Sequence, residues 1–330
     1  MCTAVNYKTD GFYFGRNLDL HYSYDEKVTI TPRNFPLKFR SVGELKNHYA
    51  IIGMATEMEG YPLYYDATNE MGVSMAGLNF PGNAVFHPFE EGKDNVSPFE
   101  FILWILGQSK DMEEVRKLLS KLHLYDEPFS KEVPLAPLHY MISYKNESIV
   151  VESVAEGLKI YENPVGVLAN NPEFTYHLHR LNDFMQVTGK TPVNLFSEKL
   201  PLKPYSLGMG SMGLPGDLSS SSRFVRAAFV KFQDYVPKGE EESVSQFFHI
   251  LDAVSQPKGC TEVEGGHFEY TIYSSCVNTE KGIYYYKTYD NSRITGIGLW
   301  EEDIEGGALI SYPLMKGQDY ILQNSKVDTK

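Results

Sequence analysis

The order of strand-like and helix-like segments is the feature that most constrains the fold of this chain. Apolar patterns typical of strands occupy residues 3–79 and return over 138–169 and 268–312, with helical patterns between them. A parallel sheet built from βαβ units would need strands and helices to alternate one by one, and they do not. The sequence therefore predicts an α+β fold, with two mostly antiparallel sheets covered by helices, in a single domain over residues 1–330.

Composition and charge exclude several classes of protein. With 42% hydrophobic and 22% charged residues, the chain can bury a substantial core, which excludes intrinsic disorder and a coiled coil. No apolar run approaches the ~20 residues that cross a bilayer, and the first residues lack the basic flank and apolar stretch of a secretory signal. A formal net charge of −13 disfavours nucleic acid as a partner. We expect a cytoplasmic protein without a membrane span.

Three motifs that could indicate a cofactor or a metal have simpler explanations. Gly208–Gly213 has the spacing G-x-G-x-x-G, but Leu214-Pro215-Gly216 follows directly, which indicates a loop instead of the helix that a dinucleotide site needs. His177 and His179 would point ~200° apart on a helix, so we expect core or solvated side chains. The three cysteines lack Cys-x-x-Cys spacing. The sequence indicates neither a metal nor an organic cofactor.

Cys2 carries the strongest chemical signal. Removal of Met1 is favoured when a small residue follows, and it would leave a free α-amine and a thiol on one residue. With reference pKa values of ~7.7–8 for the amine and ~8.5 for the thiol, the amine can accept the thiol proton and pass it to a leaving group. One residue would then supply both nucleophile and base. A chance cysteine in an edge strand is the alternative that this residue alone leaves open.

Asp10-Gly11 lies between two strand-like segments and is typical of a two-residue hairpin turn. Such a turn would pair position 2 with Asp19, with Cβ atoms ~4.5–5.5 Å apart. We therefore expect the Asp19 carboxylate beside the new terminal amine of Cys2. In the same register Asn17 would share the face of Asp19, whereas Arg16 would point to the other face and would need a bulge or bend to reach the thiol.

Further motifs accompany Met1-Cys2-Thr3 and Phe14-Gly15-Arg16-Asn17-Leu18-Asp19 along nearly the whole chain. They are Pro32-Arg33-Asn34-Phe35, Ala76-Gly77-Leu78-Asn79-Phe80-Pro81, Gly166-Val167-Leu168-Ala169-Asn170-Asn171-Pro172, Gly213-Leu214-Pro215-Gly216-Asp217, Ser222-Arg223-Phe224 and Gly282-Ile283-Tyr284-Tyr285-Tyr286. In these motifs the chain resembles the choloylglycine hydrolase family, which contains bile salt hydrolases and penicillin V acylases.

The resemblance implies the N-terminal nucleophile hydrolase fold, a four-layer αββα sandwich, and hydrolysis of an amide by acyl transfer without a cofactor. The implied substrate is a glycine- or taurine-conjugated bile salt, and the implied assembly is a homotetramer. An apolar steroid needs an apolar pocket. The segments 18–24, 58–63 and 129–138 are rich in aromatic and aliphatic residues, so they would either wall such a pocket or belong to the core.

The resemblance also implies roles for three residues near the N-terminus. Cys2 would be the nucleophile, with its own amine as the base. Arg16 would lie near the sulfur and favour the thiolate, and Asp19 would hold the amine.

Three further residues would act on the charge that develops in the transition state. The side-chain amide of Asn170 and the backbone N–H of Asn79 would donate to the tetrahedral oxyanion, and Arg223 would stabilise negative charge. Without the resemblance, Asn170 could equally be a turn residue before Pro172.

The motifs favour the bile salt branch, because Asn79 stands where penicillin acylases more often carry Tyr. Two departures, Ala4 in place of a frequent Gly and Asn171 in place of a frequent Ser, remove no reacting group. The alternatives are a penicillin V acylase, another N-acyl amide hydrolase with the same mechanism, or a non-catalytic binding protein on the same fold.

Overall fold

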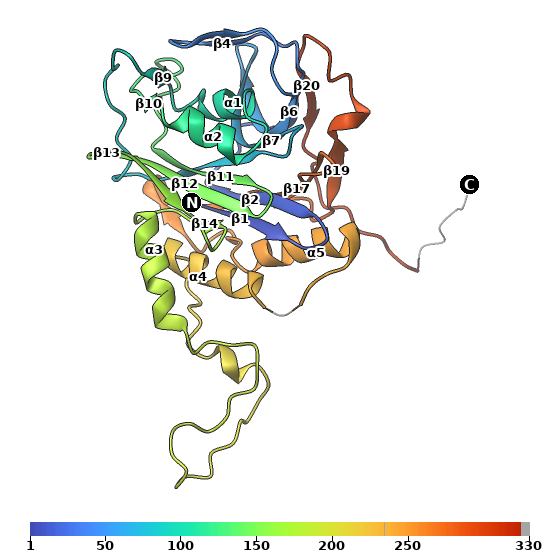
Figure 1. Cartoon of the computed structure of the whole chain (residues 1–330). Helices are drawn as coiled ribbons and strands as arrows, with labels where there is room; N and C mark the ends of the chain where they lie inside the picture. Colours follow the sequence, from blue (N-terminus) through green and yellow to red (C-terminus); the bar gives the residue numbers. More distant parts are fainter. Residues whose placement is uncertain (234, 325–330) are drawn as a thin grey trace.

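Two stacked antiparallel sheets form the centre of the computed structural model, which describes residues 1–233 and 235–324. Helices cover the outer face of each sheet (Figure 1). The predicted α+β arrangement of four αββα layers is therefore confirmed.

The six-stranded sheet contains the N-terminal strand, one position in from an edge. Its order is β14-β1-β2-β17-β18-β19, and all of its pairings are antiparallel. The strands are β14 (Val167–Leu168), β1 (Cys2–Lys8), β2 (Phe12–Leu20), β17 (Tyr270–Asn278), β18 (Ile283–Thr288) and β19 (Thr295–Gly298).

The eight-stranded sheet packs against the inner face of the first. Its order is β13-β12-β11-β8-β7-β6-β3-β20. The strands are β13 (Gly157–Glu162), β12 (Glu147–Val154), β11 (Leu138–Tyr144), β8 (Ser74–Asn79), β7 (Tyr61–Asn69), β6 (Ile51–Met58), β3 (Lys27–Thr31) and β20 (Ile310–Pro313).

Helices α1 (Phe101–Leu106) and α2 (Met112–Leu119) lie on the eight-stranded side, and α4 (Ser220–Lys231) and α5 (Gly239–Asp252) cover the six-stranded sheet. Every residue of α1 is buried, as its apolar sequence requires. No helix in the described part of the chain is both long enough and apolar enough to cross a bilayer. The remaining elements are α3 (Phe174–Arg180), η1 (Leu181–Phe184), η2 (Met209–Ser211), η3 (Glu264–Gly266), η4 (Leu299–Glu301), β4 (Leu37–Phe39), β5 (Gly43–Leu45), β9 (Asp94–Val96), β10 (Leu122–Leu124), β15 (Glu262–Val263) and β16 (His267–Phe268).

The β1–β2 hairpin corrects the predicted register. Its loop has three residues, Thr9–Gly11, so Cys2 pairs with Leu18 and not with Asp19. Long-range contacts select this loop: the Gly239 N–H at the start of α5 donates to Asp10 Oδ2 (2.8 Å), and the Thr9 hydroxyl bonds to a serine of α5 (2.7 Å). These tertiary bonds override the local two-residue turn preference.

A shift of one residue exchanges the two faces of a strand. Arg16 pairs with Ala4 and therefore lies on the same face as Cys2, towards the eight-stranded sheet. Asn17 and Asp19 lie on the opposite face, towards the helices, where Asn17 Nδ2 donates to the Leu251 carbonyl of α5 (2.9 Å). The bend that seemed necessary to bring Arg16 to the thiol is not needed.

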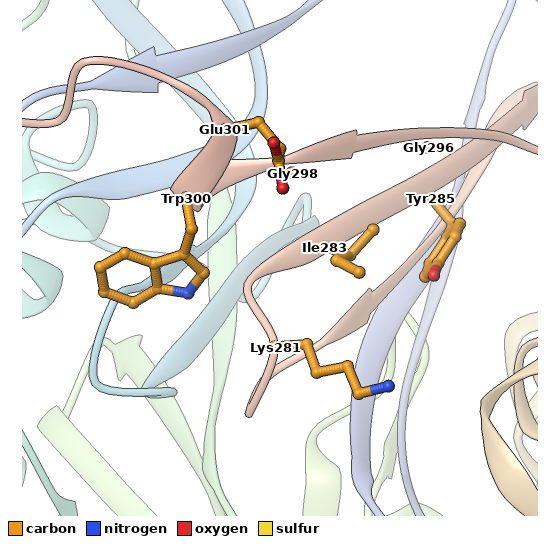
Figure 2. A pocket seen from close by; sticks show the side chains of 7 residues that line it. All are labelled: Lys281, Ile283, Tyr285, Gly296, Gly298, Trp300 and Glu301. Carbon is orange, nitrogen blue, oxygen red and sulfur yellow. The ribbon is translucent and has the colours of Figure 1, made fainter.

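Away from the end of β1, a hollow of about 360 Å³ opens beside strands β18 and β19 (Figure 2). Trp300, Tyr285, Gly296 and Gly298 line it, and the two glycines add no side chain that would fill it. None of the six predicted site residues lines this hollow.

Candidate active site

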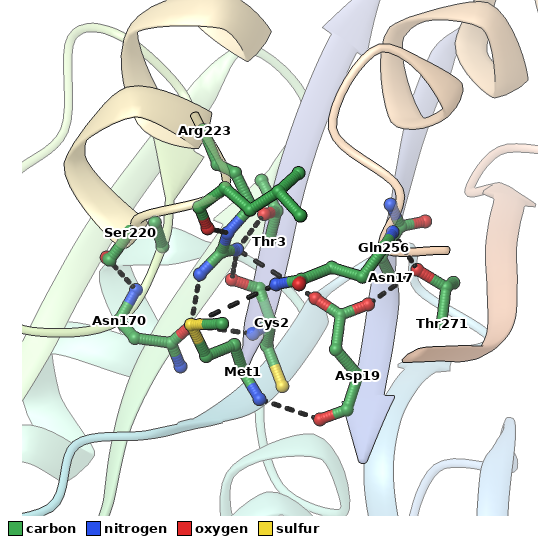
Figure 3. A network of polar contacts seen from close by, with 12 residues as sticks. Met1, Cys2, Thr3, Asn17, Asp19, Asn170, Ser220, Arg223, Gln256 and Thr271 are labelled. Atoms are coloured by element: carbon green, nitrogen blue, oxygen red, sulfur yellow. Dashed lines mark hydrogen bonds and ion pairs between the residues drawn. The ribbon is translucent and has the colours of Figure 1, made fainter. Parts of the chain in front are cut away.

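Cys2 begins β1, and its side chain is only 1% exposed. The backbone N–H of Cys2 donates to Asn170 Oδ1 at 2.6 Å, and the backbone carbonyl accepts from Arg223 Nη1 (Figure 3). The polar backbone atoms of the candidate nucleophile are thus held by two of the other predicted site residues.

Arg223 reaches this point from α4 and is completely buried. Its Nη1 also donates to the Thr3 hydroxyl, its Nη2 donates to Asn170 Oδ1 (2.8 Å), and its Nη1 lies 3.9 Å from Asp19 Oδ2. Burial lowers the pKa of Arg223, while the negative charge of Asp19 opposes this shift. A guanidinium stays protonated even so, because its ordinary pKa is above 12.

Asp19 is completely buried on the helix-facing side of β2. Its Oδ1 accepts from the Thr271 hydroxyl (2.7 Å), whereas its Oδ2 has no hydrogen-bond donor among the described residues. Burial raises the pKa of the Asp19 carboxyl, and Arg223 and the N-terminal ammonium partly offset this rise.

Met1 faces Asp19 across the hairpin. The Met1 carbonyl accepts from Asp19 N (2.9 Å), and the Met1 ammonium donates to Asp19 O and to Glu269 Oε1, both at 2.7 Å. The predicted neighbourhood of the N-terminus and Asp19 is present, but the residue opposite Asp19 is Met1 and not Cys2.

Arg16 is completely buried between the sheets. Its Nη1 donates to the carbonyls of Tyr65 and Gly77, and its Nη2 has no acceptor among the described residues. Burial lowers the pKa of Arg16, but the opposing charges, with Cys2 first and then Tyr273 and Asp66, leave its pKa above the ordinary value. A fixed positive charge therefore lies beside the thiol and favours the thiolate.

Asn170 and Asn79 come together although they are 91 positions apart: Asn170 Nδ2 donates to the Asn79 carbonyl at 2.7 Å. Asn79 ends β8 opposite Leu138, and the next pair is hydrogen-bonded, because Phe80 N donates to Pro137 O. Hydrogen-bonded and non-bonded pairs alternate in antiparallel strands, so the N–H and C=O of Asn79 both point away from β11, towards Asn170.

Asp66 is a charged neighbour that sequence reasoning missed. It lies on β7, and it accepts hydrogen bonds from the hydroxyls of Tyr273 (2.5 Å), Tyr284 (2.6 Å) and Ser275 (3.0 Å) across the sheet interface. Burial raises the pKa of Asp66, and the charge of Arg16 opposes this rise. No sequence pattern could have found the cluster, because Asp66 and Tyr284 are 218 positions apart.

The structure also places the residues of the other motifs. Gly208–Gly213 contains only a short 3-10 turn, His177 is buried and His179 is exposed. No group of His, Cys, Asp and Glu side chains suited to a metal occurs among the described residues, and all three cysteines are unpaired.

Solved structures define the class of protein to which this architecture belongs. A conjugated bile acid hydrolase from Clostridium perfringens superposes with a TM-score of 0.91 at 35% identity, covering 98% of this chain and 100% of that one. A penicillin V acylase from Agrobacterium tumefaciens superposes at 0.76 with 18% identity, covering 97% of this chain and 94% of that one. The chain has the N-terminal nucleophile hydrolase fold.

The family follows from sequence. The family model of linear amide C–N hydrolases, choloylglycine hydrolase family, matches residues 2–312, and the chain belongs to this family of amidohydrolases. A bile salt hydrolase/transferase of Lactiplantibacillus plantarum is 55% identical, covering 98% of this chain and 100% of that protein. Another from Clostridium perfringens is 37% identical, covering 96% and 98%.

Proposed function

We propose that this enzyme hydrolyses the amide bond of glycine- or taurine-conjugated bile salts, with Cys2 of the Met1-free chain as the nucleophile. The observation that carries this proposal is that the Cys2 backbone nitrogen, which would become the α-amine, lies 2.6 Å from Asn170 Oδ1 in a buried set with Arg16, Asp19 and Arg223. The named functions of the relatives supply the substrate class.

In the first step the Cys2 α-amine accepts the thiol proton. The sulfur attacks the amide carbon, a C–S bond forms, and the carbonyl π electrons move to oxygen. Asn170 Oδ1 accepts a hydrogen bond from the amine and keeps its lone pair directed at the thiol, and the negative charge of the Asp19 carboxylate offsets the charge of the ammonium that forms. Arg16 stabilises the thiolate.

In the second step the tetrahedral intermediate collapses. The Asn170 amide has a second N–H besides the one given to Asn79 O, and this N–H and the backbone N–H of Asn79 would bind the oxyanion. The C–N bond breaks, the Cys2 ammonium returns its proton to the leaving glycine or taurine nitrogen, and a thioester remains. Water, deprotonated by the same amine, then releases the bile acid.

Two of the segments expected to wall the steroid pocket, 58–63 and 129–138, meet in one aromatic cluster. Tyr61 lies 5.8 Å from Phe99 and 6.1 Å from Phe129 between ring centroids, and all three rings are only partly buried. The segment 18–24 ends at Tyr24, which is held from β6. The Thr56 hydroxyl, opposite Leu63 in the β6–β7 hairpin, donates to the Tyr24 carbonyl (3.1 Å). Such adaptable apolar surface suits a sterol ring system.

A substrate panel tests this function. Purified protein whose intact mass shows loss of Met1 should hydrolyse glycocholate and taurocholate faster than penicillin V. Penicillin V as the sole good substrate would overturn the bile salt assignment. No turnover of any amide by Met1-free protein would leave the binding-protein alternative.

We also propose a cytoplasmic homotetramer with one domain per chain. Support for assembly comes from the arm that extends below the body between α3 and α4 (Figure 1), on which large apolar side chains are exposed. Light scattering on the full chain should give four times the mass of 37.5 kDa. The most exposed of these side chains are Leu207, Leu195, Phe196 and Met185.

A further inference from the structure

Two buried histidines, neither of which the mechanism above uses, hold the backbone around Asn170. His139 Nε2 lies 2.8 Å from the carbonyl oxygen of Ala169, and His177 Nε2 lies 2.8 Å from the carbonyl oxygen of Asn170 itself. Both side chains are completely buried. Two consecutive carbonyls are thus fixed from two different elements, β11 and α3.

Glu152 links the two histidines. Its Oε1 lies 3.0 Å from His139 Nδ1 and accepts from the backbone N–H of Phe174 (3.0 Å), which begins the helix that carries His177. Glu152 is itself completely buried on β12. One carboxylate therefore joins the strand and the helix that hold the 169–170 backbone.

Each histidine ring also stacks on the residue that follows another member of the candidate site. His139 stacks on Phe80, next to Asn79, with centroids 4.3 Å apart and planes 5° apart. His177 stacks on Phe224, next to Arg223, at 4.9 Å and 22°. His139 therefore contacts the chain neighbour of each proposed oxyanion donor, Ala169 beside Asn170 and Phe80 beside Asn79.

His177 is a neutral hydrogen-bond donor towards the Asn170 carbonyl. A backbone carbonyl can only accept, so Nε2 carries the proton, and Nδ1 has no partner among the described residues. Burial lowers the pKa of His177 to about 4. The ring is therefore neutral across the pH range in which the thiol and amine work.

We propose that Glu152, His139 and His177 are positioning residues that fix the Asn170 amide relative to the Asn79 backbone, so that both donors point at one oxyanion. This role rests on the proposed function. A displacement of ~1 Å can cost 100-fold in rate, and loss of one whole oxyanion donor costs ~100- to 1,000-fold. Because His177 lies outside the steroid segments 18–24, 58–63 and 129–138, its loss should lower kcat and leave KM nearly unchanged.

The test compares two substitutions of His177. H177F keeps an aromatic ring on Phe224 but has no N–H donor, so kcat for glycocholate should fall about 10- to 100-fold, with KM within about twofold of wild type. H177Q restores an N–H donor and should recover most of kcat. The N170A/H177F double variant should be no slower than N170A, because His177 acts through Asn170.

H48F is the matched control. His48 is also buried and also bonds backbone carbonyls, those of Phe35 (2.8 Å) and Tyr49 (2.7 Å), away from the site. It should lose stability without loss of kcat. Iodoacetamide should alkylate Cys2 at the same rate in H177F as in wild type.

Wild-type kcat in H177F, an equal fall of kcat in H48F, or independent losses in the double variant would each overturn the positioning role. If H177F does not fold, H139F gives the same comparison, because it keeps a ring on Phe80 but loses the N–H towards Ala169, and wild-type kcat there would also overturn the positioning role. If wild type cleaves no conjugate but another amide from the panel, the proposed substrate fails, and the same kcat comparison is made on that amide.

Discussion

Replacing Arg223 with methionine tests the buried charge balance at the end of β1. The side chain donates to Cys2 O, to Asn170 Oδ1 and to Thr3, and it is the nearest cation to Asp19 Oδ2, at 3.9 Å. Methionine fills similar space without charge or donors, so Asp19 remains as a buried carboxylate without its counter-charge. Removing one partner of a buried pair costs about 3–5 kcal/mol in the free energy of unfolding.

Urea unfolding of R223M, followed by circular dichroism at pH 8, measures this cost. The matched control is R116M, because Arg116 forms an exposed two-point ion pair with Glu162 at 2.7 and 2.9 Å. An exposed pair contributes about 0–1 kcal/mol. A loss in R223M no larger than that in R116M would refute the reasoning.

The pH dependence provides a second check on R223M. Burial already raises the folded-state pKa of Asp19, so the folded state binds a proton more readily than the unfolded state, and stability falls as pH rises through the folded-state value. Loss of Arg223 raises that value further. The deficit of R223M should therefore be smaller at pH 5 than at pH 8, and D19N/R223M should lose this dependence. A pH-independent deficit would mean that Asp19 is not the group left uncompensated.

Four further variants test other parts of the structure. C2A should abolish turnover with the unfolding midpoint unchanged, and C2S should retain little activity because a hydroxyl is harder to deprotonate than a thiol; normal turnover in C2A would exclude the mechanism. Lys231 is buried on Asn6 Oδ1 (2.8 Å), and burial lowers its pKa to about 7. The unfolded state therefore binds more protons above pH 7, stability rises with pH between about 7 and 10, and K231M should flatten that slope in urea titrations. Gly166 has φ +62° and a Cβ there would lie 1.8 Å from Asn6 Oδ1, so G166A should lose ~2 kcal/mol or more in urea unfolding, and wild-type stability would contradict the close packing.

The sequence predicts the layers well because they depend on local patterns. Lys27–Thr31 is the strand that alternation and Pro32 indicate, and α1 follows from an unbroken apolar run. The β1–β2 register was wrong by one residue because it depends on contacts between the loop and α5, more than 200 positions away. That single residue decides which face carries Arg16.

The candidate site was likewise predictable from the sequence only in part. Motif resemblance identifies Asn79 and Asn170, but their hydrogen bond and the direction of the Asn79 N–H depend on strand pairing. Asp66 and His139 carry no motif signal, because each is a common residue type in an ordinary strand pattern. Their partners come from other strands, so only the folded chain reveals them.

Two buried guanidinium groups and two buried carboxylates surround β1, and their arrangement explains how charge is tolerated there. Arg223 and Asp19 lie on the helix-facing side, and Arg16 and Asp66 lie between the sheets, on the side of the Cys2 thiol. Each side is neutral while the thiol is protonated, which avoids the large cost of an unpaired buried charge. Deprotonation of the thiol then adds one negative charge on the side of Arg16.

Removal of the Asp66 charge should therefore make the Cys2 thiol more reactive. In D66N the charge of Arg16 is no longer balanced, so the thiolate gains stability and Cys2 should be alkylated faster than in wild type at one fixed pH. The rate of iodoacetamide alkylation of Met1-free protein at pH 7 measures this change, with C260A and C276A in the background so that Cys2 is the sole thiol. D19N is the matched control, because its carboxylate lies across the sheet with Arg223. An alkylation rate in D66N that is equal to or lower than that of wild type would show that Asp66 does not set the charge felt by the sulfur.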